Sequence, residues 1–144
     1  MCIRDRSYNG QIVTFTYPLI GNCGINRDDM ESLFPTTAGV ICREVPRLAS
    51  NWRNRSSFDE FLITHGIPGL AGIDTRALVR RLRAEGVMKG VLLDPDADLD
   101  VELEKLRDAQ LPTDQIAQVS TRTAYPSPLG GRSVVLFDLS LIHI

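Results

Sequence analysis

Residues 66–90 read G-I-P-G-L-A-G-I-D-T-R-A-L-V-R-R-L-R-A-E-G-V-M-K-G and contain a short apolar segment, a helical pattern and a second apolar segment. Leu70–Ile73 predicts a strand, and Asp74 stands where a helix N-cap accepts from the free N–H groups of the first turn. Gly86 follows the last helical turn, where a left-handed backbone is common. Because Val87–Leu93 predicts another strand, this strand–helix–strand unit indicates an α/β core.

The helix within this unit has two unlike faces. Apolar residues at 3.6-residue spacing share one face: Leu78, Val79 and Leu82. Three basic residues fall on the opposite face: Arg76, Arg80 and Arg83. The chain carries a formal net charge of -2 and lacks the basic footprint of a nucleic-acid binder. We therefore interpret the arginine face as solvated or as facing another subunit.

Two further strands are predicted before this unit. Gln11–Tyr17 and Thr37–Val45 are rich in β-branched and aromatic residues, which favour strands. A helix should follow, because Ser57 and Glu60 have the spacing of a capping box, and it should end near His65.

A third helix and a long polar connection are predicted after the unit. The helix runs from about Leu99 to Gln110, with leucines 99, 103 and 106 on its inner face. Residues 111–132 contain three prolines and a Gly-Gly pair, and we interpret them as an interdomain linker. Ser133–Asp138 then predicts the start of a new strand.

The sequence offers little catalytic chemistry. It contains no G-x-G-x-x-G, P-loop, H-E-x-x-H or Cys-x-x-Cys motif, and no metal site is predicted. Cys23 has no histidine or second base nearby in sequence, so a loop residue is favoured over a nucleophile. Cys42 is interpreted as a buried small hydrophobe, and His65 as a residue at a helix C-terminus rather than a ligand.

Trp52 leaves two alternatives open. It lies in the polar segment A-S-N-W-R, residues 49–53, and is the only tryptophan of the chain. It is either a core residue with its N–H satisfied or, together with Arg53, an interface anchor, since Trp and Arg are favoured at hot spots.

The two ends of the chain are related through their coding sequences. Residues 1–6 read M-C-I-R-D-R and residues 139–144 read L-S-L-I-H-I. An oligonucleotide that encodes the first has a reverse complement that encodes the second, and it resembles a transposase end used in library preparation. We therefore expect both ends to be translated adapter. Without them Lys+Arg falls from 16 to 14 and Asp+Glu from 18 to 17, which moves the net charge from -2 to -3.

Four segments resemble one family in order along the chain: the small (glutaminase) chain of carbamoyl phosphate synthetase. They are S-Y-N-G-Q-I-V-T-F-T-Y-P-L-I-G-N-C-G-I-N (7–26), A-S-N-W-R (49–53), G-I-P-G-L-A-G-I-D-T-R-A-L-V-R-R-L-R-A-E-G (66–86) and S-V-V-L-F-D (133–138). The resemblance implies a swivelling β/β/α-type α/β domain with a mixed sheet and about three helices. It also implies an incomplete N-terminal domain at 7–110, the linker at 111–132, and at 133–138 the first strand of a class I glutamine amidotransferase domain.

The same resemblance implies a function for the parent protein. In the family, the second domain hydrolyses L-glutamine with a nucleophilic cysteine and a His–Glu pair, so no catalytic residue is expected here. The ammonia passes to a large synthetase subunit, which uses ATP and Mg²⁺ to make carbamoyl phosphate for pyrimidine and arginine synthesis. Ser7 matches a serine that contributes to the glutamine pocket. The large subunit is the implied partner, and its candidate contacts here are Trp52, Arg53 and the arginine face.

This chain alone is then expected to be a cytoplasmic, non-catalytic structural and subunit-interaction domain, with no cofactor, nucleic acid or membrane. The cysteine content fits a reducing compartment, and no apolar run approaches the ~20 residues that span a bilayer. The isolated chain is expected to be poorly soluble or molten and to lack glutaminase activity. The alternative is an autonomous non-catalytic α/β ligand-binding or regulatory module.

Overall fold

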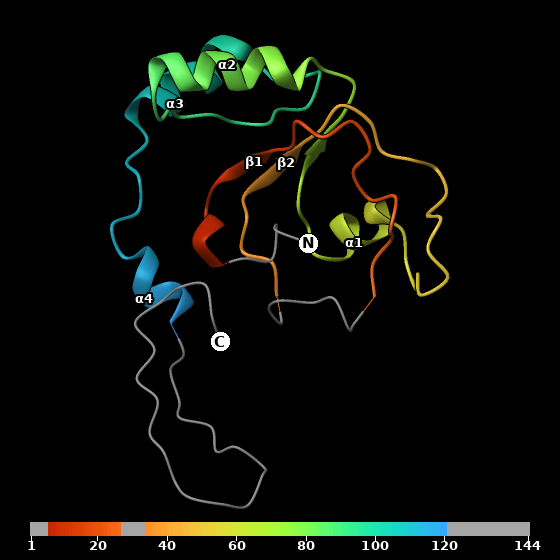
Figure 1. Cartoon of the computed structure of the whole chain (residues 1–144). Coiled ribbons are helices and arrows are strands. Elements are labelled where there is room, and N and C mark those ends of the chain that lie inside the picture. Colours follow the sequence, from red (N-terminus) through yellow and green to blue (C-terminus); the bar gives the residue numbers. More distant parts are fainter. Residues whose placement is uncertain (1–5, 27–33, 121–144) are drawn as a thin grey trace, which may run out of the picture.

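The structure of this chain, a computed structural model, describes residues 6–26 and 34–120 (Figure 1). The expected strand at 133–138, the distal part of the predicted linker, and the adapter segments apart from Arg6 lie outside these residues. Within the described part the fold is α/β, as predicted, with a small sheet and helices on both sides of it.

The sheet has three strands: β1 (Ile12–Thr14), β2 (Gly39–Ile41) and β3 (Gly69–Leu70). Their order is β1-β2-β3, and both pairs are parallel, with Val13 opposite Val40 and Ile41 opposite Leu70. The prediction of a mixed sheet is therefore wrong for the described residues. β2 and β3 each follow a long connection rather than a tight hairpin, and such a crossover returns the chain in the same direction.

The strands are shorter than predicted, and the segment 87–93 is not a strand. It lies over the sheet instead of pairing with an edge. The Leu92 Cδ1 atom is 2.7 Å from the position that a Cβ on Gly39 would take, and the Ile12 Cδ1 atom is 3.7 Å from the equivalent position on Gly90. The apolar residues that predicted a strand thus pack on a face of the sheet. Leu92 can come this close to β2 only because Gly39 has no Cβ.

The main core lies between the sheet and α1 (Phe58–Thr64). Its buried members come from β2, α1 and the loops beside them: Ile25, Val40, Phe58, Phe61, Leu62 and Ile67. The predicted capping box is confirmed, since Ser57 Oγ accepts from the Glu60 N–H at 3.2 Å and Glu60 Oε2 accepts from the Ser57 N–H at 2.8 Å. His65 is the C-cap of α1, as predicted.

Two helices lie together on the other side of the sheet from α1: α2 (Thr75–Glu85) and α3 (Leu99–Asp108) (Figure 1). The predicted caps of α2 are confirmed. Asp74 Oδ1 accepts from the Ala77 N–H at 2.9 Å, and Gly86 follows the helix with a φ of 86°. The apolar face of α2 (Leu78, Val79 and Leu82) is half-buried, so the predicted inner face is confirmed.

The predicted inner face of α3 is confirmed only in part. Leu106 is half-buried, but Leu103 is 37% exposed and Leu99 is 61% exposed. This helix therefore packs with its C-terminal half, where Lys89 Nζ also donates to the Arg107 carbonyl at 2.7 Å.

The proximal part of the predicted linker contains a fourth helix, α4 (Gln115–Val119). Val119 is buried, and the helix packs against η2 (Arg6–Tyr8), the turn at the start of the described chain. Arg6 Nη1 donates to the Val119 carbonyl at 2.6 Å, and Asn9 Nδ2 donates to Gln118 Oε1 at 2.9 Å. The chain after α3 thus returns to η2, just before β1, where α4 lies (Figure 1).

Candidate functional site

Ser7 lies in η2, beside α4. Its side chain is half-buried, and its backbone carbonyl accepts from Gln11 Nε2 at 3.2 Å. The neighbouring Asn9 contacts α4 twice, through the bond to Gln118 and through its carbonyl, which accepts from Gln115 Nε2 at 3.4 Å. Asn9 therefore joins the η2 side to α4 through two hydrogen bonds.

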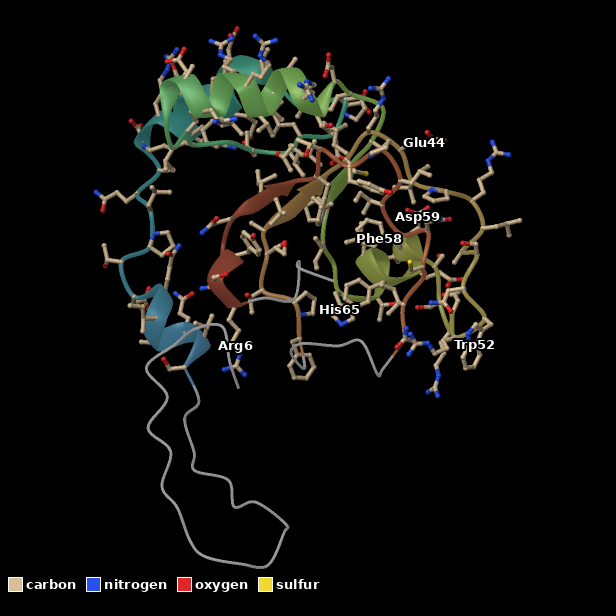
Figure 2. All side chains as sticks on the ribbon, in the orientation of Figure 1. Arg6, Glu44, Trp52, Phe58, Asp59 and His65 are labelled. Carbon is tan, nitrogen blue, oxygen red and sulfur yellow. The ribbon has the colours of Figure 1, made fainter. Side chains whose placement is uncertain are left out.

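Trp52 lies on a loop after β2, and its side chain is 91% exposed. This exposure excludes the core alternative within the described structure and leaves the interface alternative. The Arg53 guanidinium carbon lies 5.9 Å from the centroid of the Trp52 ring, within the range of a cation–π interaction. Figure 2 shows the Trp52 side chain at the periphery of the molecule, well away from Arg6.

The arginine face of α2 is exposed along its whole length. Arg76, Arg80 and Arg83 are all solvent-accessible, as is the neighbouring Arg81. Within residues 6–26 and 34–120 their guanidinium groups make no ion pair; the ion pair seen there joins Lys105 to Glu102. The face therefore offers several unneutralised positive charges on one helix.

The structure does not bring the predicted site residues together. Ser7 belongs to the η2–α4 side, Trp52 and Arg53 to the loop after β2, and the three arginines to the far side of the sheet (Figures 1 and 2). They form three separate surfaces rather than one pocket.

The two described cysteines differ in environment. Cys23 is exposed, as expected for a loop residue, and Cys42 is 2% exposed, as expected for a small hydrophobe. Burial, and to a lesser extent the Asp59 carboxylate, raise the pKa of the Cys42 thiol above its ordinary value. This shift is opposite to the one that activates a thiolate nucleophile.

His65 has neighbours that account for its position. Its Nδ1 atom lies 2.9 Å from the Phe61 carbonyl oxygen, and its ring centroid lies 4.4 Å from that of Phe61. Across the described ranges, no group of three or more His, Cys, Asp or Glu side chains is arranged to hold a metal ion. No helix in these ranges is long and apolar enough to cross a membrane.

Sequence reasoning missed the residues that shape the Trp52 loop and its apolar neighbour. Leu48 is 84% exposed on the same loop. Asn22, Asn51 and Asn54 hold the loop through hydrogen bonds. The signal available in the sequence was the asparagine and glycine content of segments 21–25 and 49–54, since both residue types favour turns.

Comparisons with known proteins identify the family. The family model described as "Carbamoyl-phosphate synthase small chain, CPSase domain" matches residues 2–92. A relative from Streptococcus pyogenes serotype M3, named carbamoyl phosphate synthase small chain, is 55% identical over 98% of this chain and 39% of its own length. Relatives of the same name from Streptococcus pneumoniae serotype 4 and Lactococcus lactis subsp. cremoris are 55% and 50% identical.

The α/β domain described above thus falls within the residues that match this family model, or directly after them. The chain belongs to the family of carbamoyl-phosphate synthase small chains. It spans 39% of the length of the Streptococcus pyogenes relative.

Proposed function

We propose that this chain is the N-terminal part of the glutamine-hydrolysing small subunit of carbamoyl phosphate synthetase. The parent protein releases ammonia from L-glutamine, and a large synthetase subunit uses it with ATP and Mg²⁺ to make carbamoyl phosphate. The observation that carries this proposal is the family match over residues 2–92, joined by 55% identity to a small chain over 98% of this chain. Pyrimidine and arginine synthesis in the cytoplasm would consume the product.

Within the parent protein we assign this chain a non-catalytic structural and subunit-interaction role. A class I amidotransferase domain with its nucleophilic cysteine and His–Glu pair would follow residue 132. The two described cysteines support a non-catalytic role for this chain: Cys42 is buried with a raised pKa, and Cys23 is an exposed loop residue.

Ser7 is the proposed glutamine contact. The position of η2 supports this assignment, because Asn9 joins it to Gln115 and Gln118 of α4. Helix α4 is the last described element before the proposed amidotransferase domain in sequence, so its contact with η2 would bring Ser7 toward that domain. A serine hydroxyl can both donate to and accept from the polar groups of a glutamine substrate.

The test uses the full-length parent chain together with its large subunit. Carbamoyl phosphate formation is measured once with glutamine and once with ammonia as the nitrogen donor. The variant Ser7→Ala should raise the KM for glutamine about 3- to 10-fold, as expected for one lost hydrogen bond, and leave the ammonia-dependent rate unchanged. Ser56→Ala is the matched control, because Ser56 is also half-buried and its β-bridge to Ile25 uses backbone atoms.

Two results would contradict the proposal. If the full-length pair forms no carbamoyl phosphate from glutamine, the parent function is wrong. If Ser7→Ala and Ser56→Ala leave the same KM for glutamine, only the role of Ser7 is wrong.

A further inference from the structure

The loop between β2 and α1 exposes large apolar side chains within a basic segment. We call residues 43–55 the Trp52 loop. Trp52 is 91% exposed and Leu48 is 84% exposed, although both are side chains whose burial would be favourable. The loop contains four arginines (Arg43, Arg47, Arg53 and Arg55) against one acidic residue, Glu44, in a chain whose net charge is -2.

The Trp52 loop is held in one conformation by hydrogen bonds to the segment 21–25. The Ser50 N–H donates to the Asn22 carbonyl at 2.8 Å, and the Arg55 N–H donates to the Ile25 carbonyl at 2.9 Å. The Ile25 N–H in turn donates to Asn54 Oδ1 at 3.2 Å. A loop that is already ordered loses little conformational freedom on binding, which favours affinity.

The tip of the loop is also ordered by its own residues. The Arg53 N–H donates to Asn51 Oδ1 at 3.0 Å, and the Asn54 N–H donates to the Asn51 carbonyl at 3.0 Å. Trp52 therefore sits on a closed turn, with the Arg53 guanidinium beside its ring. A tryptophan presented rigidly next to arginines has the composition of an interface hot spot.

The charge of the Trp52 loop defines its partner further. Arg43, Arg47 and Arg55 are exposed, and within residues 6–26 and 34–120 their side chains make no ion pair. A partner surface that matches the loop must supply carboxylates around an apolar pocket of indole size. Such complementarity steers association and excludes partners of the wrong charge.

The loop lies away from the point where the described chain ends. The last described helix, α4, contacts Asn9 on the η2 side, whereas Figure 2 shows Trp52 on the opposite side of the molecule. The relatives extend well beyond this chain, which covers 39% of the Streptococcus pyogenes protein. Within the described residues, the Trp52 loop and the η2–α4 contact thus lie on different sides of the molecule.

We infer that the Trp52 loop is the anchor by which this small chain docks on the large synthetase chain, with Trp52 in an apolar pocket rimmed by carboxylates. This inference rests on the proposed function, which supplies the identity of the partner. It assigns the arginine face of α2 a lesser part in that contact, because α2 presents charge without an exposed aromatic anchor.

The test measures the dissociation constant between the full-length small chain and its purified large chain by isothermal titration calorimetry. Trp52→Ala should raise the dissociation constant about 30-fold or more, as hot-spot truncations do, and Trp52→Phe should restore most of the affinity. Val87→Ala is the matched control, since Val87 is 96% exposed and follows α2 on the far side of the sheet. The thermal unfolding midpoint of each variant is measured in parallel and should not move.

The charge component is tested by repeating the titration at increasing salt. The dissociation constant of the wild-type pair should rise with salt, and the double variant Arg47→Gln/Arg55→Gln should show a higher dissociation constant at low salt with a flatter salt dependence. An unchanged salt dependence would overturn the carboxylate rim.

The outcomes separate this inference from the function on which it rests. If wild-type chains do not associate at all, the proposed function fails. If they associate and Trp52→Ala binds as tightly as Val87→Ala, only the docking inference is overturned. If light scattering shows that the small chain alone dimerises and Trp52→Ala abolishes that dimer, a second copy occupies the loop and the inference is likewise overturned.

Discussion

The side-chain amide of Asn9 donates to Gln118 Oε1 at 2.9 Å, joining residues 109 positions apart in the chain. This bond ties η2, which carries Ser7, to the helix α4 that leads out of the described structure. The two ends of the described chain thus meet on one side of the sheet.

Removing either partner should loosen α4 without unfolding the domain. Asn9→Ala and Gln118→Ala each remove an exposed hydrogen bond worth about 0.5–1 kcal/mol. Amide hydrogen exchange of residues 116–119 in the full-length chain should therefore become a few-fold faster. The double variant should exchange little faster than Gln118→Ala alone, because both single variants break the bond between Asn9 and Gln118, and Gln118→Ala also removes the bond from Gln118 Nε2 to Asp114 Oδ1. Unaltered exchange in all three variants would mean that the bond between Asn9 and Gln118 does not hold α4 in place.

Gly24→Ala should distort the Trp52 loop. Gly24 has a φ of 64°, and a Cβ there would overlap the side chain of Asn54. We expect a loss of about 2 kcal/mol or more in the unfolding free energy of the full-length chain, since strain and overlap add. Gly86→Ala is the control, with a φ of 86° and no atom within 4 Å of its added Cβ, and it should cost only about 1 kcal/mol. Equal costs for the two variants would contradict the close approach of Asn54.

Ser57→Ala should weaken the start of α1. The substitution removes the side-chain half of the capping box with Glu60, and losses of this kind cost about 1 kcal/mol. Amide exchange of residues 58–61 should accelerate in the full-length chain, while exchange in α2, which has its own cap at Asp74, should stay the same. Ser57→Asp should restore slow exchange, because a carboxylate also caps.

Cys42 should resist alkylation until the chain unfolds. Burial, with a smaller effect of the Asp59 carboxylate, raises its pKa above the ordinary value of 9.0, so the folded state favours the neutral thiol. The stability that this difference provides is complete below pH 9 or so and is lost as the pH rises through the folded-state pKa. Iodoacetamide at pH 8 should therefore alkylate the exposed Cys23 well before it alkylates the buried Cys42, as measured by peptide mass spectrometry. Equal labelling of the two thiols in the folded chain would contradict the burial of Cys42.

The isolated 144-residue chain should not unfold cooperatively. In the described part, β1 and β3 are both edges of the sheet and have three and two residues. Short unpaired edges beside a small core favour association and loose packing. Urea titrations followed by near-ultraviolet and far-ultraviolet circular dichroism should therefore give different midpoints. Two coincident sharp transitions would show instead that the chain folds on its own.

Local structure was predictable wherever a few neighbouring residues determine it. The cap at Asp74, the capping box at Ser57 and the C-terminal Gly86 were all predicted, because side-chain capping acts within one helical turn. The half-buried face of α2 was also predicted, since the 3.6-residue spacing of its apolar residues can be read from the helix sequence alone.

The failed predictions concern contacts between distant segments. Apolar residues at 87–93 indicated a strand, but Leu92 packs on the sheet at Gly39, and apolar content cannot distinguish edge pairing from face packing. The exposure of Leu99 on α3 depends on which neighbours reach that helix. The contact between Asn9 and Gln118 has no local signature at all.

The candidate site was predictable to a smaller extent. The sequence could not decide whether Trp52 is a core residue or an interface residue, because a tryptophan in a polar segment can point inward or outward. Its exposure in the structure excludes the core alternative. The roles of Ser7, Arg53 and the arginine face stay predictions. They rest on the resemblance and on position in the fold, since the residues they would contact lie outside this chain.

The central claim is that this chain is the non-catalytic part of a glutamine-hydrolysing small chain, and sequencing the parent gene outward from the Ser7 and Asp138 codons tests it most directly. The account predicts a continuous frame into an amidotransferase domain with a nucleophilic cysteine and a downstream histidine–glutamate pair. It also predicts that the adapter hexapeptides are absent from the gene. A native frame that stops soon after Asp138 would contradict the account and would favour an autonomous binding module.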